Sequence, residues 1–115
     1  MDVIALQTAI RLHQRLISQH ALNEAIADQL DPFDIWDSLL NQTTEAIEDY
    51  PNDPRGASCL LLSFVGSSPI HSVIAFPSPR AAAQLGHSAV AVLITVYRPD
   101  QRPTEWSPDF KRRLP

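Results

Sequence analysis

The spacing of apolar residues changes once along this chain, and that change limits the folds the chain can adopt. Before about residue 42, apolar side chains recur at intervals of three and four, which is typical of amphipathic helices. After about residue 45 they cluster in short runs separated by proline and glycine, which is typical of strands joined by turns. The sequence therefore predicts an α+β fold in which N-terminal helices pack on one face of a sheet.

The helical part, residues 1–42, is expected to hold three helices, at about 2–18, 20–30 and 32–40. For the third helix, Asp31 suits the N-cap and Pro32 the first helical position. The residues expected to be buried on the three helices are, in order, Val3, Leu6, Ile10, His13 and Ile17; Leu22, Ala25, Ile26 and Leu30; and Phe33, Trp36, Leu39 and Leu40.

Residues 45–98 are expected to form a four-stranded antiparallel sheet. The strands are predicted at 45–50, 57–65, 70–76 and 88–97, with a long connection over 76–87 before the last one. Short connections between the other strands favour an antiparallel meander. Residues 99–115 are expected to form an extended tail across the body, pinned by Trp106 and Phe110. The chain, 1–115, is thus predicted to be a single domain.

The two faces of the predicted sheet differ in character. Successive side chains of a strand point to opposite faces, so one face is fully apolar and should take the helices. The other face is mixed and carries His71 and Tyr97. In the last strand, strict alternation predicts two groups of side chains on opposite faces of the sheet. They are Val90, Val92, Ile94 and Val96 on one face, and Ala89, Ala91, Leu93, Thr95 and Tyr97 on the other. A mixed face of this kind holds a site or is covered by the tail or by a partner, and we favour cover.

Six stretches of the chain together resemble one family. They are His20-Ala21, EDYPNDP at 48–54, SCLLL at 58–62, PIHSVIA at 69–75, ITVYRPD at 94–100 and EWSPDFKRR at 105–113. In this order, over residues 18–113, they resemble the domain of unknown function 4258 family, an uncharacterised bacterial family. That family is similar to the RelE/ParE-like toxin superfamily, which packs helices on an antiparallel sheet. Several members of the superfamily cleave RNA and others bind protein targets, and the resemblance implies the fold more firmly than the activity.

RNA cleavage without a metal needs a base, an acid and cations for the phosphate. His20 and His71 are the candidate acid–base pair, because histidine titrates near about pH 6.5. Tyr97 is a candidate hydrogen-bond donor to a phosphate oxygen. The candidate phosphate- or partner-binding residues are Arg98, Lys111, Arg112 and Arg113. The alternative is structural: His20 caps a helix, His71 packs in the sheet, and the basic run is a solvated tail.

Charge favours binding over catalysis. The chain has 13 acidic against 9 basic residues, a net charge of −4, which argues against a general nucleic-acid coat. Glu24 and Asp28 also stand in a helix where the family often has basic residues, and acids there repel phosphate. We therefore expect a non-catalytic protein-binding module or regulatory subunit. Its partner would be an antitoxin-like protein, a larger assembly or a second copy. The alternative is a toxin-like, metal-independent ribonuclease or translation inhibitor, and whether the chain is an enzyme stays open.

No cofactor or metal is expected. The four histidines show no ligand spacing, and Cys59, the only cysteine, supplies no zinc pair. Glycine-rich nucleotide-binding motifs and hydrolase motifs are missing from the sequence. A single cysteine is consistent with a reducing compartment. The first residues lack the basic segment that opens a secretion signal. The longest strongly apolar stretch, 89–96, is too short to span a lipid bilayer. We therefore expect a cytoplasmic protein with no membrane partner.

Overall fold

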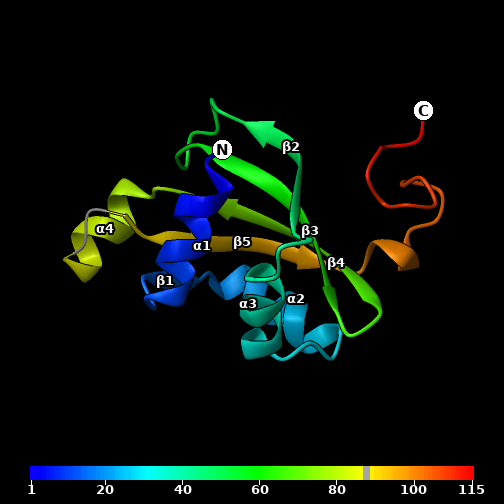
Figure 1. Cartoon of the computed structure of the whole chain (residues 1–115), viewed down its shortest axis with the longest axis horizontal. Helices are drawn as coiled ribbons and strands as arrows, with labels where there is room; N and C mark the ends of the chain where they lie inside the picture. Colours follow the sequence, from blue (N-terminus) through cyan, green and yellow to red (C-terminus); the bar gives the residue numbers. More distant parts are fainter. Residues whose placement is uncertain (87–88) are drawn as a thin grey trace.

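The structure is a computed structural model of the chain, and it describes residues 1–86 and 89–115. Within those residues it has an α+β fold with four α-helices, one short 3₁₀ helix and a five-stranded mixed sheet (Figure 1). The helices are α1 (Val3–Arg11), α2 (Gln19–Ala27), α3 (Pro32–Leu39), α4 (Pro79–Leu85) and η1 (Pro99–Gln101). The strands are β1 (Arg15–Ile17), β2 (Glu45–Tyr50), β3 (Ser58–Val65), β4 (Ser68–Ala75) and β5 (Ala91–Tyr97), in the spatial order β1-β5-β4-β3-β2.

The α+β class is confirmed, and the four expected strands, β2 to β5, form an antiparallel meander. The expected strand count is wrong, because a fifth strand makes the sheet mixed. Strand β1, which was expected to be the end of the first helix, pairs parallel with β5. The physical reason lies between the two elements, where α1 ends at Arg11 and His13 adopts a left-handed backbone with φ of 60°. The chain then turns, and the amide of Gln14 donates to the carbonyl of Ala9 at 2.9 Å. A strand of three residues is too short to show a clear alternation of apolar and polar residues, so the helical spacing of the preceding residues dominated the prediction.

The expected caps of α3 are confirmed, but some expected core positions are wrong. Asp31 Oδ1 accepts a hydrogen bond from the amide of Phe33 at 2.8 Å, and Pro32 opens the helix. However, the side chains of Phe33 and Ile26 are exposed, and so is His13. Each helix contacts the sheet along a narrow stripe, so residues at the borders of a helical face remain in water. On α3 this stripe includes Ile35, which takes the place expected for Phe33.

The long connection before the last strand is partly helical. Ser78 caps α4, because its Oγ accepts a hydrogen bond from the amide of Ala81 at 3.3 Å, and Pro79 opens the helix. The expected end of this connection at His87 and the expected strand start at Ser88 lie outside the described residues. Strand β5 itself begins at Ala91.

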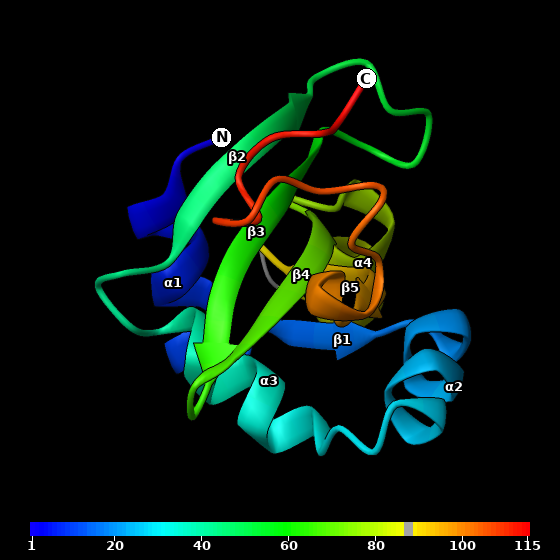
Figure 2. The ribbon, with the colours of Figure 1, turned by 90° about the vertical axis from the view of Figure 1, so that its right-hand side faces the viewer.

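The sheet separates two apolar cores. Helices α1 to α3 cover one face, and the main core lies between them and the sheet. The tail leaves β5 at the end of the molecule away from α4 (Figure 1), and Figure 2 shows it on the other side of the sheet from α1. The smaller core on that face joins Leu60, Tyr97 and Trp106 with Ile47, Tyr50, Val73 and Phe110. Trp106 and Phe110 pack against this face as expected, but the expected extended form of the tail is wrong. The tail folds back on itself through turns, and the amide of Ser107 donates to the carbonyl of Arg112 at 2.8 Å.

A β-bulge in β5 decides which side chains reach this smaller core. Val73 is opposite Thr95 and Ile74 is opposite Leu93, so Ile94 is the extra residue in β5. The strict alternation expected from the sequence is therefore wrong beyond Leu93. Leu93 and Val96 both pack in the helix-side core, whereas Tyr97 lies on the tail side with His71.

The main core should dominate stability. Leu93 is fully buried beneath the helices, so Leu93→Ala should lower the free energy of unfolding by about 2–5 kcal/mol. The matched change Leu12→Ala, at a side chain that is 60% exposed, should alter it by no more than about 0.5 kcal/mol. Urea unfolding followed by circular dichroism measures both. Equal losses for the two variants would contradict the assigned core.

Candidate functional site

His71 lies at the centre of the contact between sheet and tail. Its side chain is fully buried, Nε2 is 2.8 Å from the carbonyl oxygen of Phe110, and Nδ1 is 3.0 Å from the hydroxyl of Tyr97. A carbonyl only accepts, so Nε2 carries the proton and Nδ1 accepts from Tyr97. The ring also meets Trp106 edge-on, with ring centres 4.3 Å apart. His71 is thus a satisfied packing residue that a substrate does not reach in this arrangement.

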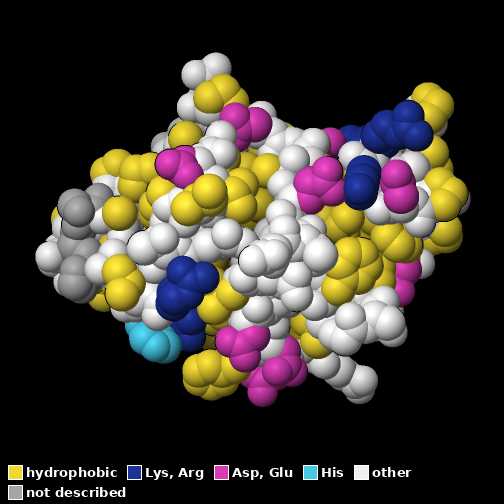
Figure 3. All heavy atoms as spheres, viewed as in Figure 1, with side chains coloured by type: hydrophobic (Ala, Val, Ile, Leu, Met, Phe, Trp, Pro, Cys, Tyr) yellow, Lys and Arg dark blue, Asp and Glu magenta, His cyan; other side chains and the backbone are white. Residues whose placement is uncertain are grey.

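The tail is held by the same cations that were candidates for phosphate binding. Arg113 Nε and Nη2 donate to the two carboxylate oxygens of Glu48 at 2.8 and 3.1 Å, and its guanidinium lies over the Trp106 ring. Lys111 Nζ is 3.0 Å from a carboxylate oxygen of Glu45. Figure 3 shows acidic and basic side chains side by side at the end of the molecule where the tail lies. These two cations hold the tail in place, so they are not available to phosphate in this arrangement.

The other two candidate cations are placed differently. Arg98 Nε donates to the carbonyl of Asp28 at 3.1 Å and so ties the end of β5 to the end of α2. Arg112 is exposed, and its backbone amide donates to Ser107 Oγ at 3.1 Å. The structure therefore does not gather the four predicted cations into one phosphate site.

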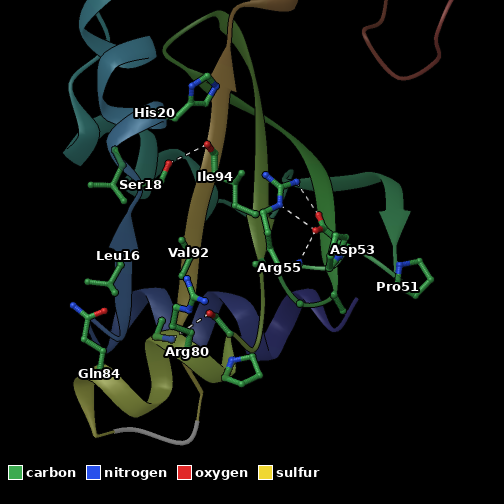
Figure 4. A pocket seen from close by; sticks show the side chains of 18 residues that line it. Leu16, Ser18, His20, Pro51, Asp53, Arg55, Arg80, Gln84, Val92 and Ile94 are labelled. Atoms are coloured by element: carbon green, nitrogen blue, oxygen red, sulfur yellow. Dashed lines mark hydrogen bonds and ion pairs between the residues drawn. The ribbon is translucent and has the colours of Figure 1, made fainter.

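The part of this sheet face that the tail does not cover is a groove of about 1020 Å³. Its floor is apolar and comes from three strands, with Leu16 of β1, Val92 and Ile94 of β5 and Ala75 of β4. One wall is the loop between β2 and β3 and another is α4, as Figure 4 shows. The remaining lining residues are Ile17, Ser18, His20, Pro51, Asp53, Pro54, Arg55, Gly56, Ala57, Ser78, Pro79, Arg80, Ala81 and Gln84.

The groove's aspartate, Asp53, forms an ion pair with Arg55, one of the two arginines that line the groove. Asp53 accepts hydrogen bonds from Arg55 Nε and Nη2 at 3.0 and 2.9 Å and from Ser58 Oγ at 2.8 Å. The Arg55 guanidinium and amide hold the pKa of Asp53 well below its usual range. Arg55 Nη1 is left over, and Arg80 makes no hydrogen bond or ion pair with any residue of the described ranges. Among the described residues, the groove therefore presents one arginine without a partner, Arg80, beside an apolar floor.

His20 lines the groove from the first turn of α2 and does not cap that helix. The cap is Ser18, whose Oγ accepts from the amide of Ala21 at 3.0 Å and donates to the carbonyl of Ile94 at 3.0 Å. His20 Nε2 is 3.2 Å from Glu24 Oε1, and its side chain is 69% exposed. His20 and His71 are therefore not brought together: one is at the groove surface and the other is enclosed under the tail.

Glu24 has a role that the sequence does not reveal. Its Oε1 accepts a hydrogen bond from the amide of Val96 at 3.1 Å. Strand β1 ends at Ile17, so the edge of β5 beyond it needs other partners. Ser18 and Glu24 supply them, and Glu24 at the same time holds the His20 ring. The acid that was expected to repel phosphate thus supports the edge of a strand.

Sequence reasoning also missed the two groove arginines. Arg55 stands in PNDPRG, a stretch recognised only as turn chemistry, although an aspartate two residues before an arginine is a signal for a local ion pair. Arg80 stands in the long connection, and nothing near it in the sequence points to the groove. The described residues contain no group of three or more histidine, cysteine, aspartate or glutamate side chains placed to hold a metal. Across the same residues no helix has the length and apolar character needed to cross a membrane.

The buried state of His71 should make stability depend on pH. Burial is the largest influence and lowers the pKa of His71, against the opposing hydrogen bond to Phe110. As pH falls below about 6.5, the unfolded chain takes up a proton that the folded His71 resists, so the folded state loses stability. His71→Gln should flatten this part of the pH dependence, measured by urea unfolding between about pH 7.5 and 5.5. Gln42→Ala, at an exposed residue without a titratable group, should leave the slope unchanged. Identical slopes for wild type and His71→Gln would show that His71 titrates equally in both states.

Comparison with known proteins agrees with the resemblance seen in the sequence. A family model described as a domain of unknown function (DUF4258) matches residues 17–98, which is more than half of the chain. The matched part includes His20, His71, Tyr97 and every groove residue except Leu16, whereas residues 99–115 of the tail lie outside it. No curated protein and no solved structure matches the chain. The chain belongs to the DUF4258 family.

Proposed function

We propose that this chain is a protein-binding module with a RelE/ParE-like arrangement of helices on a sheet. It would hold a segment of another protein, or of a second copy, in the groove. The observation that carries this proposal is the uncovered apolar floor of Leu16, Ala75, Val92 and Ile94. An apolar surface recessed between charged walls is typical of a site that a partner covers.

The arrangement of the two histidines supports binding over catalysis. General acid–base cleavage needs both groups within hydrogen-bond reach of one substrate, directly or through a water. Here His71 is fully buried under the tail, and it is not among the residues that line the groove. Lys111 and Arg113, which would neutralise a phosphate, are paired with Glu45 and Glu48.

The lining of the groove favours protein over RNA. Proteins that bind single-stranded RNA commonly stack its bases on aromatic rings and follow its backbone with a row of cations. Among the lining residues that the structure describes there is no phenylalanine, tyrosine or tryptophan, and Asp53 stands beside one of the two arginines. The net charge of −4 would also slow the approach of a nucleic acid.

One observation favours a second candidate function, RNA cleavage or translation inhibition of the toxin type. The Glu24 carboxylate is fixed by the amide of Val96 and holds the exposed His20 ring, which is how carboxylates orient catalytic histidines. Arg80 would then supply a cation. For this second function the groove offers His20 as a general base but no second histidine as the acid. We therefore rank it below protein binding.

Site-specific crosslinking tests the binding function. A photoreactive residue in place of Gln84, on the groove wall, should form a covalent adduct with a protein in extract of the native host, or with a second copy in the purified sample. The same residue in place of Gln42, an exposed position outside the groove, should not. Electrophoresis and mass spectrometry identify the adducts, and nuclease treatment should leave them unchanged.

A pair of lysine substitutions provides the control for that experiment. Leu16→Lys puts a charge on the groove floor at the end strand of the sheet, where lysine is tolerated, and should remove the adduct. Ile4→Lys, at a side chain that is 78% exposed on α1, should preserve it. Thermal unfolding confirms that both variants fold. Adducts that are absent at Gln84, or that persist in Leu16→Lys, would disprove binding in the groove.

RNA digestion tests the second candidate. Under the binding function, purified chain should not cleave cellular RNA above the background of a His20→Ala preparation, as judged by gel electrophoresis. If the toxin-type function holds instead, His20→Ala should reduce cleavage about 100- to 10,000-fold, which is the range for a lost acid–base group. His13→Ala, at an exposed histidine outside the groove, should then have no effect.

A further inference from the structure

We infer that the outer face of α1 binds a second copy of this chain, so that two α1 helices pack against each other in antiparallel directions. This surface and the groove lie on opposite sides of the sheet, because α1 packs on the face away from the tail. The inference therefore goes beyond the proposed groove binding and does not depend on it. It is carried by the pattern of exposed side chains along α1.

Helix α1 is apolar on two opposite faces, and the structure covers only one of them. The inner face packs Leu6, Ala9 and Ile10 into the main core. On the outer face, Ile4 is 78% exposed, and Leu12, the C-cap residue, is 60% exposed. Helices with apolar residues on more than one face are typically covered on each of those faces. The outer face of α1 is therefore a surface that a partner would cover.

The exposed apolar residues of α1 form a continuous line. Ile4, Thr8 and Leu12 are spaced four residues apart, so they share one face, and we call them the α1 stripe. Thr8 is exposed, but its hydroxyl donates to the carbonyl of Ile4 at 3.0 Å, so the polar group of the stripe already has a partner. By contrast, Ile26 on α2 and Phe33 on α3 are exposed singly, which is ordinary for a protein surface.

Figure 3 views the molecule from the side of α1 and shows hydrophobic side chains at the surface over this helix. Arg11 is the only charged residue within α1, and it is exposed. It stands three residues from Thr8, at the border of the α1 stripe, where a long side chain can keep its guanidinium in water while its stem covers apolar surface. The stripe can therefore be covered without burying a charge.

The order of side chains in the α1 stripe fits a second copy. Read from either end, the stripe is a large apolar residue, a short residue and a large apolar residue. In an antiparallel pair, Ile4 of each copy meets Leu12 of the other, and the two Thr8 residues meet at the two-fold axis. Short side chains at the centre let the two helices approach closely. Antiparallel packing also places oppositely charged ends of the helix dipoles side by side.

The size and charge of this contact set its strength. A contact between two short helices is smaller than the roughly 1,200–2,000 Å² that stable protein complexes bury. The net charge of −4 on each copy also opposes association. We therefore expect a weak dimer whose population rises with protein concentration, with the groove of each copy left open.

Sedimentation of the purified full chain at concentrations up to about 1 mM tests the inference. The wild-type chain should pass from monomer to dimer as its concentration rises. Ile4→Lys and Leu12→Lys should each raise the dimer Kd about tenfold or more, because each puts a charge into the apolar contact. Leu16→Lys, on the groove floor, should leave that Kd unchanged. A chain that stays monomeric throughout would overturn the inference, and a dimer weakened by Leu16→Lys instead would assign association to the groove.

Two further variants test the antiparallel geometry. In the double variant Ile4→Lys/Leu12→Glu, each lysine meets a glutamate of the other copy, so this variant should dimerise more tightly than Ile4→Lys alone. Thr8→Cys should form a disulfide-linked dimer under mild oxidation, because the two positions meet and Cys59 is fully buried. Ala27→Cys, at an exposed position of α2 at the other end of the molecule (Figure 2), should stay largely monomeric. Equal crosslinking of both cysteine variants, or a double variant no tighter than Ile4→Lys, would contradict the antiparallel pair.

Discussion

The strands at the middle of this sheet are apolar on both faces, and apolar surface left against water costs free energy in proportion to its area. In β3 the first six residues, Ser58–Ser63, are all buried, which requires cover on both sides of the strand. Helices α1 to α3 supply that cover on one side over the length of the sheet. On the other side the tail covers only the end near His71 and Tyr97. The groove is the part of this sheet face that the tail leaves uncovered, so the groove exists because the tail ends its contact near His71 and Tyr97.

The bulge at Ile94 connects the two ends of this second face. By adding one residue to β5 it keeps Leu93 and Val96 among the helices and turns Tyr97 toward the tail, where Tyr97 bonds to His71. The same distortion directs the carbonyl of Ile94 and the amide of Val96 to Ser18 and Glu24 at the start of α2. The short β1 makes this possible, because a longer strand would occupy that edge. A local irregularity in one strand thus determines what faces the tail and what faces the groove.

The predictable features were those whose cause lies in neighbouring residues. The start of α3 follows from Asp31 and Pro32, and cover by the tail follows from two aromatic side chains in a proline-rich end. Strand β1 and the bulge depend on pairing with residues far along the chain, so the local pattern around Ile17 and Ile94 was misleading. The groove has no local cause, since α4, β1 and the β2–β3 loop meet only in the folded chain. For the same reason, the sequence could not show that His20 is exposed whereas His71 is buried.

The tail also bears on the choice between the two functions. For His71 to meet a substrate, Trp106 would have to leave the sheet and the pairs of Arg113 and Lys111 would have to break. Removing a buried tryptophan typically costs about 3–5 kcal/mol, and the exposed ion pairs add little. At about 1.4 kcal/mol per tenfold change, a released tail would be present in roughly one molecule in a hundred to one in several thousand. A partner that binds the uncovered groove needs no such release. For the proposed binding, the groove as it stands is therefore the arrangement that costs least, and His71 and the tail hold the sheet that forms its floor.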